Sequence, residues 1–320
     1  MAEHTESLPL LIVASDFKFK QFDYDRFEIG YIKQYSELVI WDLSFLCFKS
    51  FNKAISSAPY KGKDLKVISS FKQLFSEIIY IKENYNTKDV FVMNFVSPIS
   101  LGSLFFLILV KKMGINSIKY FNSGVPQISS ANTNISMDYL AKALMRRFYF
   151  IVSKLFDVFP THCIYAGDFW KQKYEKIVKK KKAKWLSGNT WDYSNILSKN
   201  IINSNPSPSC KKISVLLDGA GPMFNSDDVR IGKKTYITSE IWYPSLVSFL
   251  DKVEKVSNVR VEIAAHPKAS HKSNPSCFGY RNVTYGKVMD MVRDANFVIT
   301  RQSTAISYAV IFKKPILFIY

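Results

Sequence analysis

The chain alternates between short apolar runs and longer stretches whose apolar residues recur at helical spacing. In the first half, the short runs predict strands because they are rich in branched or aromatic side chains and bounded by turn residues. These strands are expected at 8–15, 37–46, 89–96, 115–121 and 162–165. Helical spacing predicts helices at 23–38, 67–84, 98–113 and 138–156, and a lysine-rich helix follows Asp168. Gly114 is placed to end the third of these helices as its C-terminal cap.

The same alternation begins again after a stretch of different composition. Residues 185–211 are rich in Ser, Asn and Pro, as linkers commonly are. Beyond them, strands are expected at 212–217, 259–265, 281–285, 296–300 and 315–320. Helices are expected at 239–256, 286–295 and 303–312. Repeated strand–helix units of this kind favour parallel sheets covered by helices.

The pattern therefore predicts an α/β protein with two facing Rossmann-like domains and a cleft between them. We expect an N-terminal acceptor-binding domain at 1–190, a linker at 191–210 and a C-terminal nucleotide-sugar-binding domain at 211–320. The chain stops on a strand, whereas twin-domain folds usually add helices there. We therefore expect the second domain to be truncated at Tyr320.

Composition and charge narrow the class of protein. The 320 residues are 48% hydrophobic, enough for a packed core in each of two domains. Lys and Arg exceed Asp and Glu by 44 to 26, a net charge of +18, which indicates nucleic acid, a membrane surface or a phosphorylated substrate as partner. General solubility is the alternative explanation.

Part of this charge is concentrated between residues 171 and 184, where eight of fourteen residues are lysine. Aromatic residues lie among and beside these lysines. A basic helix of this kind commonly lies on anionic lipid. We therefore expect a membrane-binding surface at Lys179, Lys180, Lys181 and Lys182.

The N-terminal segment and the cysteines indicate a cytoplasmic protein. The N-terminal segment contains Glu3 and Glu6 and lacks the basic region of a signal peptide. The apolar run 99–110 is too short to span a bilayer. Any membrane contact is therefore expected to be peripheral. The four cysteines are far apart and lack metal-ligand spacing, so we expect reduced thiols.

Polar residues follow three strands predicted in the second half, where ligands bind to an open α/β sheet. Asp218-Gly219 follows the first strand, and its carboxylate is either a general base or a turn residue that bonds its own backbone. His266, before Pro267 and Lys268, could bind a phosphate oxygen or assist its departure, or could be structural. Arg301 precedes Ser303-Thr304, which is expected to open a helix and bind phosphate there, or only to cap it.

The first half offers fewer candidates. Asp16 ends the first strand at the position equivalent to Asp218 and is a second candidate for the base. Asn122 and Ser123 follow another strand and are expected on the acceptor side. We expect no metal and no cofactor, because the four histidines form no paired spacing. His271, five residues after His266, is expected on a loop.

Three short motifs occur in a fixed order: Leu217-Asp218-Gly219, His266-Pro267 and Ser303-Thr304. Together they resemble the motifs of bacterial sialyltransferase- and polysialyltransferase-like GT-B glycosyltransferases, which use CMP-nonulosonates or CMP-Kdo in capsule and lipopolysaccharide synthesis. The resemblance covers about residues 212–320. Leu217 stands where the first motif often has another acidic residue, which leaves the base open between Asp218 and Asp16.

The resemblance implies an inverting, metal-independent transferase that moves sialic, pseudaminic or legionaminic acid, or Kdo, from CMP to a surface-polysaccharide acceptor. It implies that Asp218 is the base and that His266, Ser303 and Thr304 contact the CMP phosphate. The expected location is the inner face of the bacterial cytoplasmic membrane, beside a lipid-linked acceptor. The sequence also resembles CDP-glycerol glycerophosphotransferases, although Arg301-Gln302 replaces their usual Asp-Tyr. A basic nucleic-acid-binding protein is a further alternative, which only the charge favours.

Overall fold

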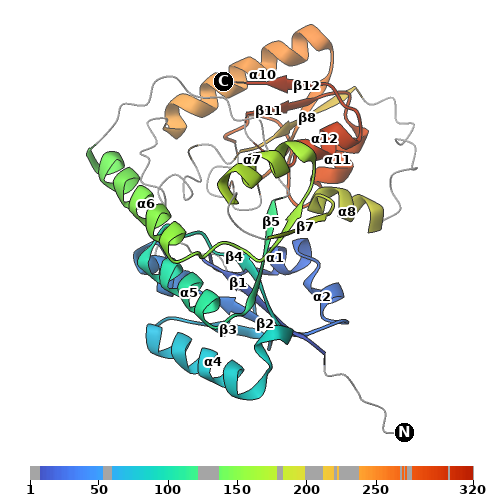
Figure 1. The fold of residues 1–320 in the computed structure, drawn as a ribbon. Helices are drawn as coiled ribbons and strands as arrows, with labels where there is room; N and C mark the ends of the chain where they lie inside the picture. The colour runs from blue at the N-terminus through green and yellow to red at the C-terminus, as the bar shows by residue number, and fades with distance from the viewer. Residues whose placement is uncertain are drawn as a thin grey trace, which may run out of the picture. The chain divides into compact units, whose positions relative to one another are not determined.

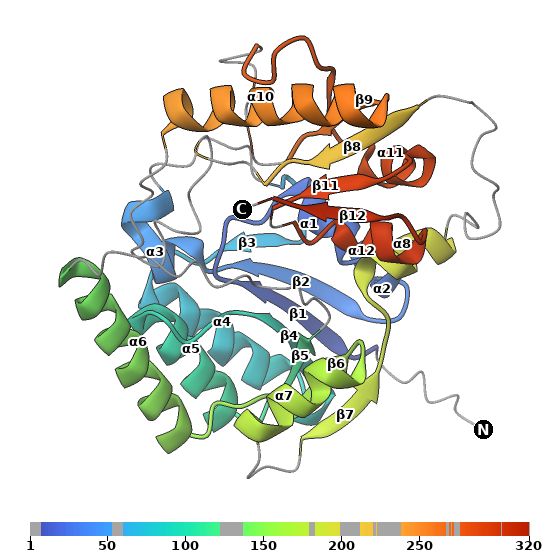
Figure 2. The ribbon, with the colours of Figure 1, turned by 90° about the horizontal axis from the view of Figure 1, so that it is seen from above.

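The computed structural model describes residues 8–52, 60–121, 137–178, 183–198, 212–219, 222, 238–266, 269, 271, 276–301 and 303–319. The chain divides into two compact units, residues 1–122 with 140–189 and residues 123–139 with 190–320. Each unit contains a parallel β-sheet with helices packed against it (Figures 1 and 2).

The sheet of the first unit has seven described strands, all paired in parallel. Their order across the sheet is β3 (Leu65–Val67), β2 (Glu37–Asp42), β1 (Leu10–Ser15), β4 (Val90–Phe95), β5 (Asn116–Phe121), β6 (His162–Tyr165) and β7 (Lys184–Ser187). Chain order runs outward in both directions from β1 and β4. The boundary between these two strands is therefore the switch point at which such folds bind ligands.

Among the described residues, seven helices and one 3₁₀ turn connect these strands. They are α1 (Gln21–Arg26), α2 (Ile29–Ile32), α3 (Ser44–Asn52), α4 (Phe71–Asn84), η1 (Thr87–Asp89), α5 (Leu101–Lys112), α6 (Met137–Leu155) and α7 (Asp168–Val178). All six residues of β1 are buried, since alternate side chains point to opposite faces and helices cover both. This is why the strand appears in the sequence as a continuous apolar run.

The prediction of one helix at 23–38 is wrong. Glu28 adopts a left-handed backbone conformation with φ of 53°, and it separates α1 from α2. Phe27 and Ile29 are both buried, although residues two apart on one helix point in nearly opposite directions. The break lets both side chains reach the core, and the Phe27 ring stacks on Phe95 with 4.1 Å between centroids.

The strand expected at 37–46 ends at Asp42, and α3 begins at Ser44. The buried Asp42 carboxylate explains this, because it accepts hydrogen bonds from the backbone N–H groups of Ser44 (2.9 Å) and Phe19 (3.0 Å). Strands β3 and β7 were not expected from the sequence. Both are short and mostly exposed or half-buried, so neither has a distinctive apolar run. Gly114 has φ of 69° after α5, which confirms it as a left-handed residue at the helix end.

The described part of the second unit has a parallel sheet of the same kind, with five strands. Its order is β10 (Val283–Thr284), β9 (Arg260–Ala264), β8 (Ile213–Leu217), β11 (Val298–Thr300) and β12 (Ile316–Phe318). Its described helices are α8 (Trp191–Ser198), α10 (Ser239–Ser257), α11 (Val288–Asp294) and α12 (Ile306–Ile311). The switch point of this sheet lies between β8 and β11.

Two apolar cores lie on opposite faces of this second sheet. On one face, Leu246 and Leu250 of α10 pack with Val261 and Ile263 of β9. On the other, α8, α11 and α12 pack against β8. Helix α8 falls within the segment expected as a linker, and its Ile196 is completely buried in this second core. The polar composition of that segment predicts a linker, but the apolar residue Ile196 packs its helix against the core.

Candidate functional site

The three motifs of the second half follow three neighbouring strands. Leu217, the last residue of β8, is in register with Ala264 of β9 on one side and Thr300 of β11 on the other. Asp218, His266 and Arg301 therefore follow strand ends at the same edge of the sheet. The edge includes the switch point between β8 and β11, where ligands bind in open α/β sheets.

Asp218 is buried and its carboxylate has two described hydrogen-bond partners. Oδ2 lies 2.8 Å from Nε2 of His271 and accepts a 3.3 Å hydrogen bond from the backbone N–H of His266. The carboxylate thus ties the end of β8 to the segment that follows β9. The hydrogen bond to its backbone positions His266, whose side chain is half-buried at the sheet edge.

His271 is the functional candidate that the sequence prediction missed. It is 3% exposed, and its ring packs edge-on against Phe278 at 4.9 Å between centroids. Its backbone N–H donates to the hydroxyl of Tyr285 (3.1 Å), and its Nδ1 lies 3.6 Å from Sγ of Cys277. A lone histidine five residues after His266 carries no signal of such a pairing, because its partners are distant in the chain.

These contacts form a chain from thiol to imidazole to carboxylate. Burial, with a smaller contribution from Asp218, raises the pKa of the Cys277 thiol to about 11. The thiol therefore stays protonated at neutral pH and can donate to Nδ1, which leaves Nε2–H to donate to Asp218. A protonated, buried thiol is a poor nucleophile, so the arrangement orders the site and does not make Cys277 reactive.

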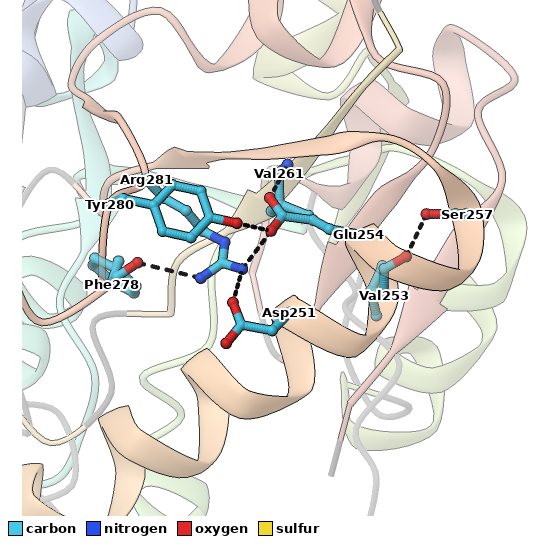
Figure 3. A network of polar contacts seen from close by, with 8 residues as sticks. All are labelled: Asp251, Val253, Glu254, Ser257, Val261, Phe278, Tyr280 and Arg281. Atoms are coloured by element: carbon cyan, nitrogen blue, oxygen red, sulfur yellow. Dashed lines mark hydrogen bonds and ion pairs between the residues drawn. The ribbon is translucent and has the colours of Figure 1, made fainter.

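A second polar network holds residues 278–281 against α10 (Figure 3). The buried guanidinium of Arg281 lies 2.6 Å from Oδ1 of Asp251 and 2.6 Å from Oε2 of Glu254. Glu254 also accepts from the hydroxyl of Tyr280 and, through Oε1, from the backbone N–H of Val261 (2.7 Å). Because both carboxylates are on α10, this network fixes the segment that includes Cys277 and Tyr285.

The expectation that Ser303-Thr304 opens a helix is wrong. Helix α12 begins at Ile306, after Ala305 as its N-cap residue. Ser303 to Ser307 instead form successive tight turns, with backbone hydrogen bonds from Ile306 to Ser303 (3.2 Å) and from Ser307 to Thr304 (3.3 Å). Ser303 Oγ accepts from the N–H of Ala305 (3.3 Å), whereas Thr304 is exposed.

Arg301 is exposed at the end of β11 and lies against an aromatic ring. Its guanidinium carbon is 5.2 Å from the centroid of the Trp242 ring on α10. Such cation–π contact orients a guanidinium without removing its charge. Arg301 thus offers a positive group that is oriented by α10 at the end of β11, and Gly219 is exposed after Asp218 at the same sheet edge.

Asp16 occupies the corresponding switch point of the first unit. It is 3% exposed, and its Oδ2 accepts a 3.0 Å hydrogen bond from the backbone N–H of Ser97, which follows β4. Burial lowers the pKa of the nearby Lys119 ammonium, and the charge of Asp16 opposes that shift. Both base candidates are therefore buried carboxylates that hold a neighbouring loop.

The remaining predicted site residues lie outside the described part of the chain. They are Pro267 and Lys268 on the donor side, Asn122 and Ser123 on the acceptor side, and Lys179, Lys180, Lys181 and Lys182 of the expected membrane surface.

The first unit also has an apolar hollow, at the opposite end of its strands. Pro9, Leu10 and Leu11 line it together with Tyr31, Ile32, Tyr35, Ser36, Phe91 and Ile118. Leu10, Leu11 and Phe91 lie at or near the amino ends of β1 and β4. Ligands of open α/β sheets bind beyond the carboxyl ends of the strands, so we do not assign the donor to this hollow.

The described residues contain neither a metal-binding cluster nor a helix that could span a membrane. No group of three or more His, Cys, Asp and Glu side chains among them is arranged to hold a metal ion. Likewise, no helix within the described ranges is both long enough and apolar enough to cross a membrane. Cys47, Cys163 and Cys277 have free thiols and are buried, while Cys210 lies outside those ranges.

Comparison with known proteins finds similarity in fold but not in sequence. No protein-family model and no curated protein sequence matches the chain. UDP-N-acetylglucosamine 2-epimerase from Rickettsia bellii is similar with a TM-score of 0.50 and 8% identity, over 97% of this chain and 78% of that one. UGT2 of Phytolacca americana, complexed with UDP-2fluoro-glucose and pterostilbene, has a TM-score of 0.52 and 7% identity, over 97% and 80% of the two chains.

A UDP-glucosyltransferase from Polygonum tinctorium is similar to the same degree, with a TM-score of 0.52, 8% identity and coverage of 98% of this chain and 80% of that one. Likeness at such low identity is evidence of shared fold only. With the two parallel sheets, it confirms the α/β class and the GT-B type of fold, built from Rossmann-like units.

Proposed function

We propose that the chain is an inverting, metal-independent glycosyltransferase that moves a nonulosonic acid from a CMP-activated donor to a surface-polysaccharide acceptor. The sugar would be sialic, pseudaminic or legionaminic acid, or Kdo. The observation that carries this proposal is the placement of Asp218, His266, Arg301, Ser303 and Thr304 after three neighbouring strands, at the sheet edge that includes the switch point. These residues belong to the motifs through which the sequence resembles CMP-sugar transferases.

The chemistry asks the protein mainly to bind the leaving phosphate and to orient the acceptor. A CMP-nonulosonate has a good leaving group, so its departure is assisted by positive charge and hydrogen-bond donors near the phosphate. His266, Arg301, Ser303 and Thr304 would supply these, with Gly219, Pro267 and Lys268 nearby on the donor side. Asn122 and Ser123 would lie on the acceptor side, where orientation lowers the entropic part of the barrier.

A general base must remove the proton from the acceptor hydroxyl. Asp218 is the candidate that the resemblance indicates, and Asp16 is the candidate at the equivalent position of the first unit. Each carboxylate accepts a backbone hydrogen bond, which the amide oxygen of asparagine can also accept. Asp218→Asn and Asp16→Asn would therefore remove the base while preserving the size of the side chain and this bond. The variant that abolishes turnover while still binding CMP identifies the base.

We further propose that the enzyme works at the inner face of the bacterial cytoplasmic membrane. The net charge of +18 supports an anionic surface as a partner. A lipid-linked acceptor would lie at this surface.

Release of nucleotide from a panel of donors tests the function. The purified chain is incubated with CMP-sialic acid, CMP-Kdo, CMP-pseudaminic acid, CDP-glycerol, UDP-glucose and UDP-N-acetylglucosamine, each with and without EDTA. We expect CMP release from one CMP-sugar, unaffected by EDTA. Release from CDP-glycerol alone would identify a glycerophosphotransferase, and turnover of a UDP-sugar alone would identify a UDP-sugar enzyme.

A UDP-sugar enzyme is the second candidate because one similar structure contains UDP-2fluoro-glucose. Nucleotide binding, measured without an acceptor, distinguishes a CMP-sugar enzyme from a UDP-sugar enzyme. If CMP raises the melting temperature of the chain and UDP does not, the CMP reading is supported. The reverse result would overturn it.

A further inference from the structure

Helix α6 exposes a continuous row of large apolar side chains. Leu144, Phe148, Ile151 and Leu155 are 68%, 53%, 57% and 77% exposed. Their spacing of four, three and four residues places them on one side of the helix, one turn above another. We call these four residues the α6 stripe.

The opposite side of α6 is the side packed against protein. Tyr149 and Ser153 are almost completely buried there, and Ser153 Oγ donates to the carbonyl of Tyr149 (2.6 Å). A surface helix normally turns its apolar side inward, but α6 turns this row of large apolar side chains outward. Single exposed apolar residues are common, whereas a contiguous row marks a surface that another phase or molecule covers.

Charge indicates what covers the stripe. Arg147 and Lys154 lie next to it on the helix surface, and Lys154 Nζ is 4.6 Å from the centroid of the Phe150 ring. The sequence of α6 contains four basic residues, Lys142, Arg146, Arg147 and Lys154, against one acidic residue, Asp138. An apolar row bordered by cations is complementary to an anionic bilayer, which offers acyl chains below a layer of negative headgroups.

Helix α4 provides a comparison within the same unit. Phe71, Phe75 and Ile79 also form an exposed apolar row, with exposed fractions of 44%, 43% and 51%. The charges of α4 cancel, because Lys72 and Lys82 are matched by Glu77 and Glu83. Apolar exposure is therefore shared by the two helices, and the excess of positive charge is specific to α6.

We propose that α6 docks the chain on an anionic phospholipid bilayer by inserting the α6 stripe at the level of the headgroups. The helix lies beside α5 in both views of the fold (Figures 1 and 2). No described helix can span the bilayer, so α6 would lie along the surface. The purpose of this docking rests on the proposed function with a lipid-linked acceptor. Binding to the bilayer can nevertheless be measured with no donor or acceptor present.

Flotation with vesicles tests the docking surface. The full chain is mixed with vesicles of phosphatidylcholine, either alone or with phosphatidylglycerol, and the vesicle-bound fraction is measured. We expect binding only to the anionic vesicles, and the double change Phe148→Ser and Ile151→Ser should weaken it by about tenfold or more. The matched control, Phe75→Ser with Ile79→Ser on α4, should bind within about twofold of the natural chain. The charge variant Arg147→Glu with Lys154→Glu should also lose binding. It tests the same surface if the apolar variant does not fold.

Three outcomes would overturn this proposal: no binding of the natural chain to anionic vesicles, equal binding of the α6 variants, or equal loss in the α4 control. A natural chain that is a dimer in light scattering, and a monomer after the α6 changes, would assign the stripe to a second copy instead. The docking test and the enzymatic test can be told apart by measuring nucleotide release without vesicles. The rate of release should be the same for the natural chain and the α6 variants, whichever donor is used.

Discussion

Asp218 Oδ2 lies 2.8 Å from Nε2 of His271, 53 residues further along the chain. Both side chains are buried, and the same carboxylate oxygen accepts the backbone N–H of His266. One carboxylate therefore joins the end of β8 to the second residue after β9 and to His271. Truncating the Asp218 or His271 side chain should therefore affect the position of His266 as well as the local stability.

His271→Ala should destabilise the second unit. The change leaves the buried Asp218 carboxylate without one of its hydrogen bonds, at a cost of about 2–4 kcal/mol. Urea unfolding measures the loss, and His271→Gln, which retains an N–H donor, should recover part of it. His162→Ala in the first unit is a control, expected to cost about 1 kcal/mol or less because that ring is only half-buried. Equal stability of His271→Ala and the natural chain would contradict this account of the pair.

His266→Ala should lower the release of nucleotide by about 100-fold or more, since a positioned histidine commonly contributes that much to catalysis. Its side chain is half-buried, and its hydrogen bond to Asp218 comes from the backbone, so the fold should persist. Steady-state kinetics and thermal melting check the two halves of this prediction. A variant that retains full turnover would show that the histidine has no role in donor chemistry.

Arg301→Ala should raise the KM for the donor about tenfold, because it removes an exposed charge proposed to meet the phosphate. Arg301→Lys keeps the charge but loses the planar contact with the Trp242 ring, so an intermediate KM is expected. Arg293→Ala is the matched control, since that guanidinium pairs with Asp290 and Asp294 on its own helix. If both alanine variants raise KM equally, the effect is one of general charge.

Cys277 should react slowly with iodoacetamide in the folded chain. Its pKa is raised from 9.0 to about 11 by burial, so at pH 8 the thiolate is about 100-fold scarcer than in the unfolded chain. The raised pKa also contributes stability that is fully present below pH 9 and is lost as the pH rises through 11. Peptide mass spectrometry after labelling, with and without urea, measures the protection. Fast native labelling at pH 8 would show that the thiol is open to solvent.

Most of the fold follows from local sequence patterns. A parallel strand buried on both faces appears as an apolar run, and an amphipathic helix repeats its apolar residues every three or four positions. For this reason β1, β4, β8, β9 and β11 were predicted near their observed positions, as were α4, α5 and α10. Errors occurred where a distant partner decides the backbone, as in the break at Glu28 that lets Phe27 and Ile29 both enter the core.

The sequence by itself determined that Asp218, His266 and Arg301 each follow a strand, because polar residues ending apolar runs are visible without coordinates. Only the tertiary structure decided that these strands are neighbours, that Ser303-Thr304 precedes the helix instead of opening it, and that His271 pairs with Asp218. The apolar stripe on α6 likewise follows from its spacing, but its outward direction does not. Spacing along a chain records which residues share a face, whereas packing between distant segments decides which face is covered.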